Sequence, residues 1–336
     1  MASSNNTSLS ESYFPTNNST STAPVWALTL IGILTFTTVI SNLVVIILFI
    51  VSSRLRTPFN YYLLNIAIND FLTGAVAMPY YAFFTYYGYW PLSDTHCTIW
   101  MFFDFSVPFV SLWGVVAISL DRLWAVIRPI SYRRNNNRKK AFVLIAAGWF
   151  INYSALLPGY IYTRTHFTNQ SVIRTCLWDQ EGIPAWATNF PVVVVDIFTP
   201  MVLTVVFYIL IGLEIRKSNL RMASVVGPVN DARKPRSRKR LRDRQAFMVL
   251  TSLVVAFVAA WLPWVVCEAL QLITEESYPV FSAVTYWTSY ALSGLNPFMF
   301  GIASRDMRQA FRHLTRGKNQ AASNRGSRIA PSSSRF

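Results

Sequence analysis

Long apolar stretches alternate with short polar segments along the whole chain. Each stretch is near or above the roughly 20 residues that cross a bilayer as a helix. The seven stretches lie at about 27–51, 60–84, 95–127, 139–162, 187–215, 244–272 and 279–303. A soluble helical core would repeat polar residues at the helical period, and these stretches mostly do not. The pattern therefore predicts an all-α membrane protein, a bundle of seven transmembrane helices.

The positive charge is confined to one set of the connecting segments. The chain is 53% hydrophobic and carries a net charge of +15, which first suggests a nucleic-acid partner. The basic residues lie at Arg54 and Arg56, from Arg122 to Lys140, from Arg216 to Arg244, and after Arg305, with only Arg164 and Arg174 on the other side. This bias predicts an extracellular N-terminus and a cytoplasmic C-terminus. No segment is long enough for a basic soluble domain, so no nucleic-acid binding is expected.

The segments outside the spans predict three further parts. Residues 1–26 read as an extracellular glycosylated tail, 304–315 as an amphipathic helix, and 316–336 as a cytoplasmic tail, around a seven-transmembrane domain at 27–303. The amphipathic segment places four apolar residues on one side, Met307, Ala310, Phe311 and Leu314. Sequons stand at Asn5, Asn6, Asn17, Asn18 and Asn169, all on the predicted outer side. Asn152 also begins a sequon, but it lies within a span and is expected to stay unmodified.

The cysteines and histidines indicate no catalytic or metal chemistry. Cys97 and Cys176 both fall on the predicted outer side, where an oxidising environment favours joining them. Cys267 lies within the sixth span and reads as a buried free thiol. No pair of the three histidines is spaced for a metal, and no P-loop or nucleophile elbow is present. The sequence therefore predicts neither an enzyme nor a resident cofactor.

Asp104 is an acidic residue inside one of the longest apolar runs. A carboxylate in a membrane span is costly unless it is paired or faces a watery cavity, so it is a candidate binding group. The aromatic residues expected around it are Trp100, Phe105, Trp261, Trp264, Tyr286 and Tyr290. Aromatic faces around a carboxylate suit an ammonium ligand through cation–π contacts. The alternative is that these rings only pack or face lipid.

Two further acids extend this interpretation. Asp196 lies in an otherwise apolar run of the fifth span, one turn before Pro200. It either contacts a ligand or is a buried acid that holds a proton or a water. Glu268, one turn after Trp264, either adds negative charge to the pocket mouth or extends towards water.

A set of residues spread over the spans resembles the rhodopsin class of G-protein-coupled receptors, and within it the aminergic group. These residues are Asn42, Asp70, Asp121-Arg122, Trp149, Pro200, Phe257, Trp261-Leu262-Pro263 and Asn296-Pro297. The resemblance covers about residues 27–315. It implies a sodium site at Asp70, Ser111, Ser293 and Asn296, and a heterotrimeric G protein, guessed as Gi/o, as partner. Arrestin, receptor kinases and the membrane lipid are further expected partners.

The resemblance also implies a coupling switch at the cytoplasmic ends of the spans. Arg122 is expected to pair with Asp121 and with Asp243, or else to be a solvated charge. Ile130 resembles the apolar knob that docks into a G protein. Phe300 stands where a tyrosine is usual, after Asn296-Pro297, and removes a hydroxyl that would act with Tyr208.

The acid in the fifth span narrows the expected ligand. An acidic residue at the position of Asp196 is similar to histamine receptors of the H-three and H-four type, which favours histamine as a two-ended cation between Asp104 and Asp196. A muscarinic-like acetylcholine receptor is an alternative, although Val265 stands where such receptors carry an asparagine. A ligand-independent receptor and a transporter are further alternatives. A transporter predicts internal repeats, and none is visible.

Overall fold

The computed structural model describes residues 24–167, 176, 191–225, 234–274, 276 and 278–314. Side chains at 163, 166–167, 219–225, 234–246, 249, 272 and 303 are likewise outside the description. The five predicted glycosylation sites and the side chain of Asp243 therefore lie outside the described residues.

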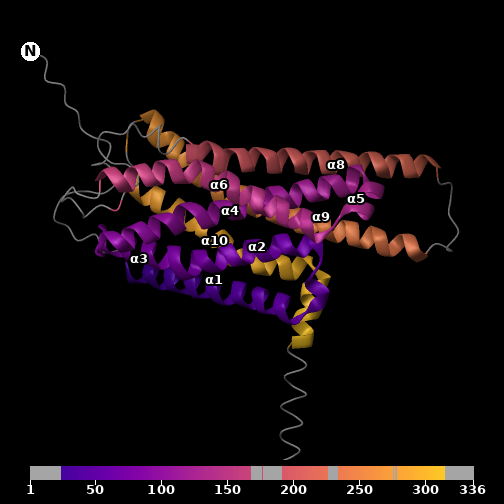
Figure 1. Cartoon of the computed structure of the whole chain (residues 1–336), viewed down its shortest axis with the longest axis horizontal. Helices are drawn as coiled ribbons and strands as arrows, with labels where there is room; N and C mark the ends of the chain where they lie inside the picture. Colours follow the sequence, from indigo (N-terminus) through magenta and orange to yellow (C-terminus); the bar gives the residue numbers. More distant parts are fainter. Residues whose placement is uncertain are drawn as a thin grey trace, which may run out of the picture.

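The described chain is a bundle of long, roughly parallel helices (Figure 1). The long elements are α1 (Val25–Val51), α2 (Pro58–Leu72), α3 (Met78–Tyr87), α4 (Asp94–Ile127), α6 (Arg138–Phe167), α8 (Thr199–Val225), α9 (Lys234–Thr274) and α10 (Pro279–Ala303). Shorter ones are the 3-10 turn Ser53–Leu55, the π-helical turns Thr73–Ala77 and Val193–Phe198, α5 (Pro129–Asn135) and a helix over 305–314. The predicted seven-helix bundle is confirmed, with α2 and α3 forming one span and the second π turn beginning the fifth.

Five helices of the described chain are long and apolar enough to cross a membrane by themselves: Val25–Val51, Asp94–Ile127, Arg138–Tyr162, Val193–Ser218 and Leu250–Gln271. The second span misses this criterion because a π turn divides it into shorter helices. The prediction of a loop over 216–243 was wrong at both ends, because α8 continues to Val225 and α9 begins at Lys234. Arginine and lysine are good helix formers and are frequent here, so both helices extend past their apolar parts.

Each π-helical turn ends two residues before a proline. Pro200 has no N–H and its ring would collide with the carbonyl of Asp196 four residues earlier, so the backbone widens there. The hydroxyl of Thr199 donates to the carbonyl of Val194 at 2.7 Å and satisfies an acceptor in the widened turn. Pro79 follows the other π turn in the same way. Asp196 therefore sits on a backbone bulge, which α-helical spacing does not reveal.

Glycine is required at two places where the elements meet or end. Gly88 ends α3 with φ +69°, a left-handed conformation that side chains disfavour. Gly114 lets α4 approach α2, because a Cβ there would lie 3.0 Å from a side-chain carbon of Ile66. The absence of a side chain at Gly114 therefore lets α2 and α4 pack closely around the polar groups described below.

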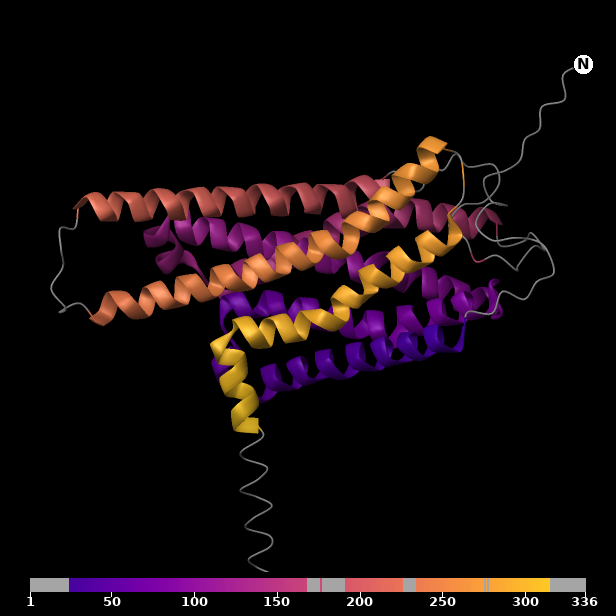
Figure 2. The same ribbon diagram turned by 180° about the vertical axis from the view of Figure 1, so that it is seen from behind.

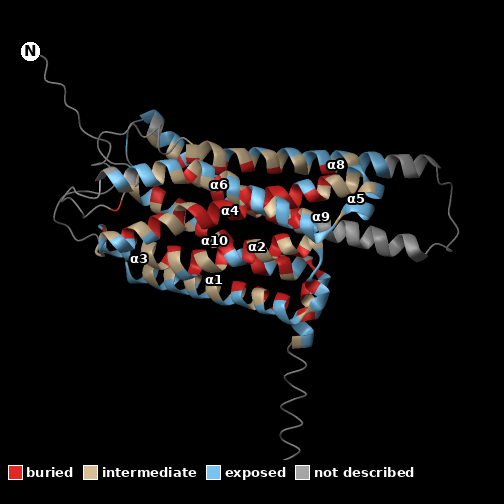
Figure 3. Ribbon diagram, viewed as in Figure 1, coloured by how far each residue is buried: buried red, intermediate tan, exposed pale blue. Residues whose placement is uncertain are grey.

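Helix α4 runs through the centre of the bundle. In the most apolar stretch of α4, 83% of the residues are buried, compared with 28% in the corresponding stretch of α1. Figure 3 shows the buried residues concentrated along α4. Pro108 lies inside α4 without interrupting the helix. The predicted disulfide is confirmed: Cys97, near the start of α4, is joined to Cys176 with a Cα–Cα distance of 5.8 Å. We call the Cys97 end the outer end and the Arg122 end the inner end, after the predicted orientation.

The helix over 305–314 turns across the inner end of the bundle (Figure 2). Met307 and Ala310 are buried against the bundle, and Leu314 packs against the same core. Phe311 was predicted on the same side, but it is 48% exposed. Its position, one residue past Ala310, rotates it by about 100° away from the buried face. The amphipathic helix is present, with a narrower buried face than expected.

Candidate functional site

The carboxylate of Asp104 is held by two tyrosines of α10. Asp104 is only 2% exposed. Its Oδ2 accepts a hydrogen bond from the Tyr286 hydroxyl at 2.6 Å, and its Oδ1 accepts one from the Tyr290 hydroxyl. The two tyrosines lie one turn apart, so both hydroxyls reach the same acid. The structure therefore brings Asp104, Tyr286 and Tyr290 together as expected from their spacing.

A continuous set of rings surrounds this carboxylate. The ring centroid of Trp264 lies 6.1 Å from that of Trp261 and 6.3 Å from that of Tyr286. On the other side, Trp100 stacks on Tyr81 at 6.1 Å and on Trp90 at 5.0 Å. Aromatic faces attract a cation, with about 0.5–2 kcal/mol for each well-placed ring. A carboxylate surrounded by aromatic rings is the chemistry that suits an organic ammonium.

Tyr81 of α3 is a member of this cluster that sequence reasoning missed. Its ring lies 4.6 Å from that of Tyr286 and 5.8 Å from that of Tyr290. It is eleven residues after Asp70, which is close to three full turns of helix and places both on one side. The π turn between them alters this register, so the spacing indicated only weakly that Tyr81 faces the bundle.

The other predicted pocket residues lie farther from the acid. Phe105 follows Asp104 and packs near Phe109, which in turn lies 5.3 Å from Trp261, centroid to centroid. Trp261 is 4% exposed and lies deeper in the bundle than Trp264. Glu268 is half-buried one turn beyond Trp264, towards the outer end.

Asp196 faces a different neighbourhood from Asp104. It is fully buried, and its Oδ1 accepts a hydrogen bond from the indole N–H of Trp113 at 3.2 Å. Asn152 of α6, also fully buried, is the other polar neighbour of this carboxylate. Nine residues separate Trp113 from Asp104, about two and a half turns, so their side chains leave α4 on opposite sides. A ligand contact for Asp196 stays a prediction, whereas its contact with Trp113 is observed.

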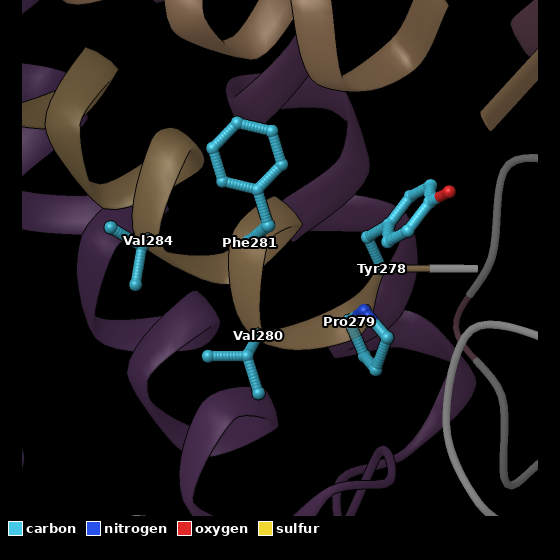
Figure 4. Close-up of a pocket in the computed structure, with 5 residues that line it drawn as sticks. All are labelled: Tyr278, Pro279, Val280, Phe281 and Val284. Atoms are coloured by element: carbon cyan, nitrogen blue, oxygen red, sulfur yellow. The ribbon is translucent and has the colours of Figure 1, made fainter. Parts of the chain in front are cut away.

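A shallow hollow on the surface lies at the start of α10 (Figure 4). It is lined by Tyr278, Pro279, Val280, Phe281 and Val284. Val280 and Val284 are largely exposed, whereas Tyr290 of the same helix is buried. The hollow has no charged group, so it offers nothing to hold an ammonium. This hollow is therefore not a candidate site for an ammonium ligand.

Below the aromatic cluster, the four residues of the predicted sodium site meet at one carboxylate. Asp70 accepts hydrogen bonds from Ser293 at 2.8 Å, from Asn296 at 2.7 Å and from Ser111 at 3.4 Å. All four residues are buried. Hydroxyl and amide groups can turn their oxygens to a hard cation, so this donor set fits sodium.

The chain matches the family described as 7 transmembrane receptor (rhodopsin family) over residues 41–300. The chain belongs to this family. Family membership confirms the predicted receptor class and shows that the chain is a multi-pass membrane receptor and not an enzyme.

Two relatives narrow the group. The muscarinic acetylcholine receptor DM1 of Drosophila melanogaster is 39% identical over 132 residues, which cover 39% of this chain and 16% of the relative. The muscarinic acetylcholine receptor M3 of Gallus gallus is 32% identical over 142 residues, covering 41% of this chain and 22% of the relative. The chain thus spans less than a quarter of the length of these relatives. They support the aminergic group, and the similarity to histamine receptors stays a prediction.

At the inner end of this receptor, Asp121 is the centre of a polar network. Its buried carboxylate pairs with the guanidinium of Arg122 and with the ammonium of Lys140. The Tyr132 hydroxyl donates to the same carboxylate at 2.9 Å. Burial raises the pKa of Tyr132, so the phenol stays a neutral donor there. The predicted pair of Arg122 with Asp121 is observed, whereas Lys140 and Tyr132 were not foreseen.

The remaining residues predicted to take part in coupling differ in their exposure to solvent. Ile130 of α5 is 84% exposed at the inner end, where a partner can reach it (Figure 1). Tyr208 stacks on Phe247 of α9 with 5.6 Å between ring centroids. Phe300 is fully buried in α10, beyond Pro297, in the core that also packs against Tyr208. The pairing of Arg122 with Asp243 lies outside the described residues.

Proposed function

We propose that this receptor binds a small organic ammonium ligand with Asp104 as its counter-ion. The observation that carries the proposal is the buried carboxylate held by Tyr286 and Tyr290 inside a set of aromatic rings. A buried carboxylate is costly to keep charged without a cationic partner. An ammonium ligand supplies that partner, and the rings stabilise its charge without hydrogen bonds.

Acetylcholine, or another quaternary ammonium, is the first candidate ligand. Both oxygens of Asp104 already accept a tyrosine hydroxyl, so the ligand needs to supply charge but no N–H donor. A quaternary ammonium has charge and no N–H. The names of the two muscarinic relatives point the same way. Val265, half-buried at the position where an asparagine was expected for this group, counts against it.

Histamine is the second candidate, and Asp196 is the observation that favours it. A second buried acid in the bundle suits a ligand with a second donor. Oδ2 of Asp196 has no partner within hydrogen-bond distance among the described residues, although the buried Asn152 amide lies near enough to compete with a ligand for it. To contact histamine bound at Asp104, the Asp196 side chain has to turn away from Trp113. Acetylcholine makes no such demand, so a change at Asp196 distinguishes the two ligands.

The signal is proposed to pass to a heterotrimeric G protein at the inner end, with Arg122 and the exposed Ile130 as contact points. The distribution of basic residues supports a cytoplasmic inner end and an extracellular N-terminus. Sodium at Asp70 is proposed as a regulator, because cations that bind one state of a receptor shift its population. Arrestin and receptor kinases remain expected partners, and Gi/o remains the expected subtype.

The test is a binding and signalling assay on the full chain in membranes, with acetylcholine and histamine as ligands. We expect Asp104→Asn to abolish binding of the active amine, because the counter-ion charge is lost. Asp306→Asn, at an exposed position on the helix over 305–314, is the matched control and should bind normally. Normal affinity in Asp104→Asn at normal surface expression would refute the proposal.

The same assay decides between the ligands. If acetylcholine is the ligand, Asp196→Asn should leave its affinity unchanged, because this acid faces Trp113. If histamine is the ligand and bridges both acids, Asp196→Asn should reduce its affinity strongly. No response to any amine from a receptor that reaches the cell surface would favour the ligand-independent alternative.

A further inference from the structure

Lys140 is a second cation on the buried carboxylate of Asp121. Its Nζ pairs with Oδ1, while Arg122 and the Tyr132 hydroxyl use Oδ2. The Asp121 side chain is 0% exposed, the Lys140 side chain 20% and the Arg122 side chain 16%. One acid is therefore paired with two bases through different oxygens.

Lys140 is held in place independently of Arg122. Its Nζ lies 4.3 Å from the ring centroid of Trp124 and 5.2 Å from that of Tyr132, and it donates to the Asn136 side chain at 3.4 Å. The backbone N–H of Lys140 donates to Asn137 at 2.9 Å, at the start of α6. These contacts fix the ammonium beside Asp121 whether or not the guanidinium is there.

Arg122 shares Tyr132 with Lys140 and has a further neighbour in α2. Its guanidinium carbon lies 4.1 Å from the ring centroid of Phe59 in α2, and Nη2 donates to the Tyr132 hydroxyl at 2.7 Å. If Arg122 were the only partner of Asp121, its departure would leave a buried, uncompensated carboxylate, which costs several kcal/mol. An acid with Lys140 on its other oxygen keeps one full counter-ion.

We propose that Lys140 is a permanent counter-ion of Asp121 that reduces the cost of releasing Arg122. Lys140 thereby raises the population of receptors whose arginine is free to meet a G protein. The second statement rests on the proposed coupling function, whereas the first concerns this chain alone. Lys140 is a positioning residue, since it acts through Asp121 on Arg122.

The first statement is tested by a stability cycle on the full-length receptor in detergent. Unfolding is followed through the thiol of Cys267, which is buried and is the one cysteine of the chain outside the disulfide. Arg122→Gln and Lys140→Gln are made singly and together. We expect the unfolding midpoint of the double variant to fall by about 5 °C or more beyond the sum of the single losses, because only then is Asp121 uncompensated.

Three controls isolate the charge. Lys140→Arg should behave as wild type, and Lys139→Gln, its exposed neighbour, should combine additively with Arg122→Gln. In an Asp121→Asn background the excess loss should vanish. Additive losses in the main cycle, or an excess that persists with Asp121→Asn, would overturn the proposal. If the double variant does not fold, the triple variant decides: folding of the triple supports the proposal and failure of the triple refutes it.

The consequence for signalling is measured as basal nucleotide exchange on a panel of G proteins. Lys140→Gln should lower the rate per receptor, because Asp121 then holds Arg122 alone. A rate equal to or above that of wild type overturns the second statement. Absence of exchange by the wild type on every G protein would refute the proposed coupling, and the stability cycle would still decide the counter-ion role.

Discussion

The indole of Trp113 donates a hydrogen bond to the fully buried carboxylate of Asp196 across 3.2 Å. This bond ties the central helix α4 to the π-helical turn at the start of the fifth span. It turns the second intramembrane acid towards α6 and away from Asp104. An acid that sequence reasoning treats as a ligand contact therefore already has a partner within the protein.

Replacing Trp113 by Phe should destabilise the receptor. The phenyl ring is smaller than the indole, so some packing is lost. The buried carboxylate also loses its indole donor, which costs a further amount of about 1–3 kcal/mol. The unfolding midpoint measured by Cys267 reactivity should fall, and it should fall less in an Asp196→Ala background. Trp26→Phe, at a 68% exposed position, is the control and should leave the midpoint unchanged. Equal losses in both backgrounds would show that the bond contributes nothing.

Replacing Tyr290 by Phe should change the selectivity between amines. Without the hydroxyl, one oxygen of Asp104 is open to an N–H donor from the ligand. Affinity for a primary amine should rise relative to its quaternary analogue by about fivefold, the factor for one kcal/mol. Competition binding of the two analogues measures the ratio. An unchanged ratio would mean that the hydroxyl does not compete with the ligand.

Replacing Tyr81 by Leu should weaken ammonium binding. The ring contacts both tyrosines that hold Asp104, and a single cation–π contact contributes about 0.5–2 kcal/mol. Tyr81→Phe keeps the ring and should bind normally. Tyr80→Leu changes the neighbouring ring, which faces Trp90 and His96 instead. If Tyr80→Leu has the same effect as Tyr81→Leu, the loss reflects packing of α3 and not the ligand site.

Sodium should alter agonist affinity through Asp70. In the wild type, exchanging sodium for a bulky organic cation at constant ionic strength should change agonist affinity, because only sodium fits among the four polar side chains. Asp70→Asn removes the negative charge and should abolish the sodium dependence. Binding isotherms in the two salts provide the comparison. A sodium effect that survives in Asp70→Asn would place the ion elsewhere.

Replacing Gly88 by Ala should lower the unfolding midpoint. An added Cβ meets no atom within 4 Å, so the cost arises only from the left-handed backbone, at about 1–2 kcal/mol. Gly212→Ala is the matched control, because it also has open space but lies within α8 without a positive φ. Alanine there should leave the midpoint unchanged or raise it. Equal effects at both positions would contradict the backbone explanation.

The sequence by itself determined the seven spans, the disulfide, the acid at Asp104 and the polar set around Asp70. Span length, hydropathy and helical spacing are local properties of the chain, so residues such as Tyr286 and Tyr290, one turn apart, could be assigned to one face. The motifs, one for each span, were specific enough to indicate the receptor family that the comparison confirmed.

Only the tertiary structure decided which partners the buried charges take. The π turn before Pro200 changes the helical register and points Asp196 towards Trp113. The π turn before Pro79 changes the register of α3 in the same way, and Tyr81 there contacts Tyr286. Lys140 and Asp121 are 19 residues apart in the chain and meet only because α4 and α6 pack side by side. Such contacts depend on the rotation of one helix against another, which the period of a single helix does not contain.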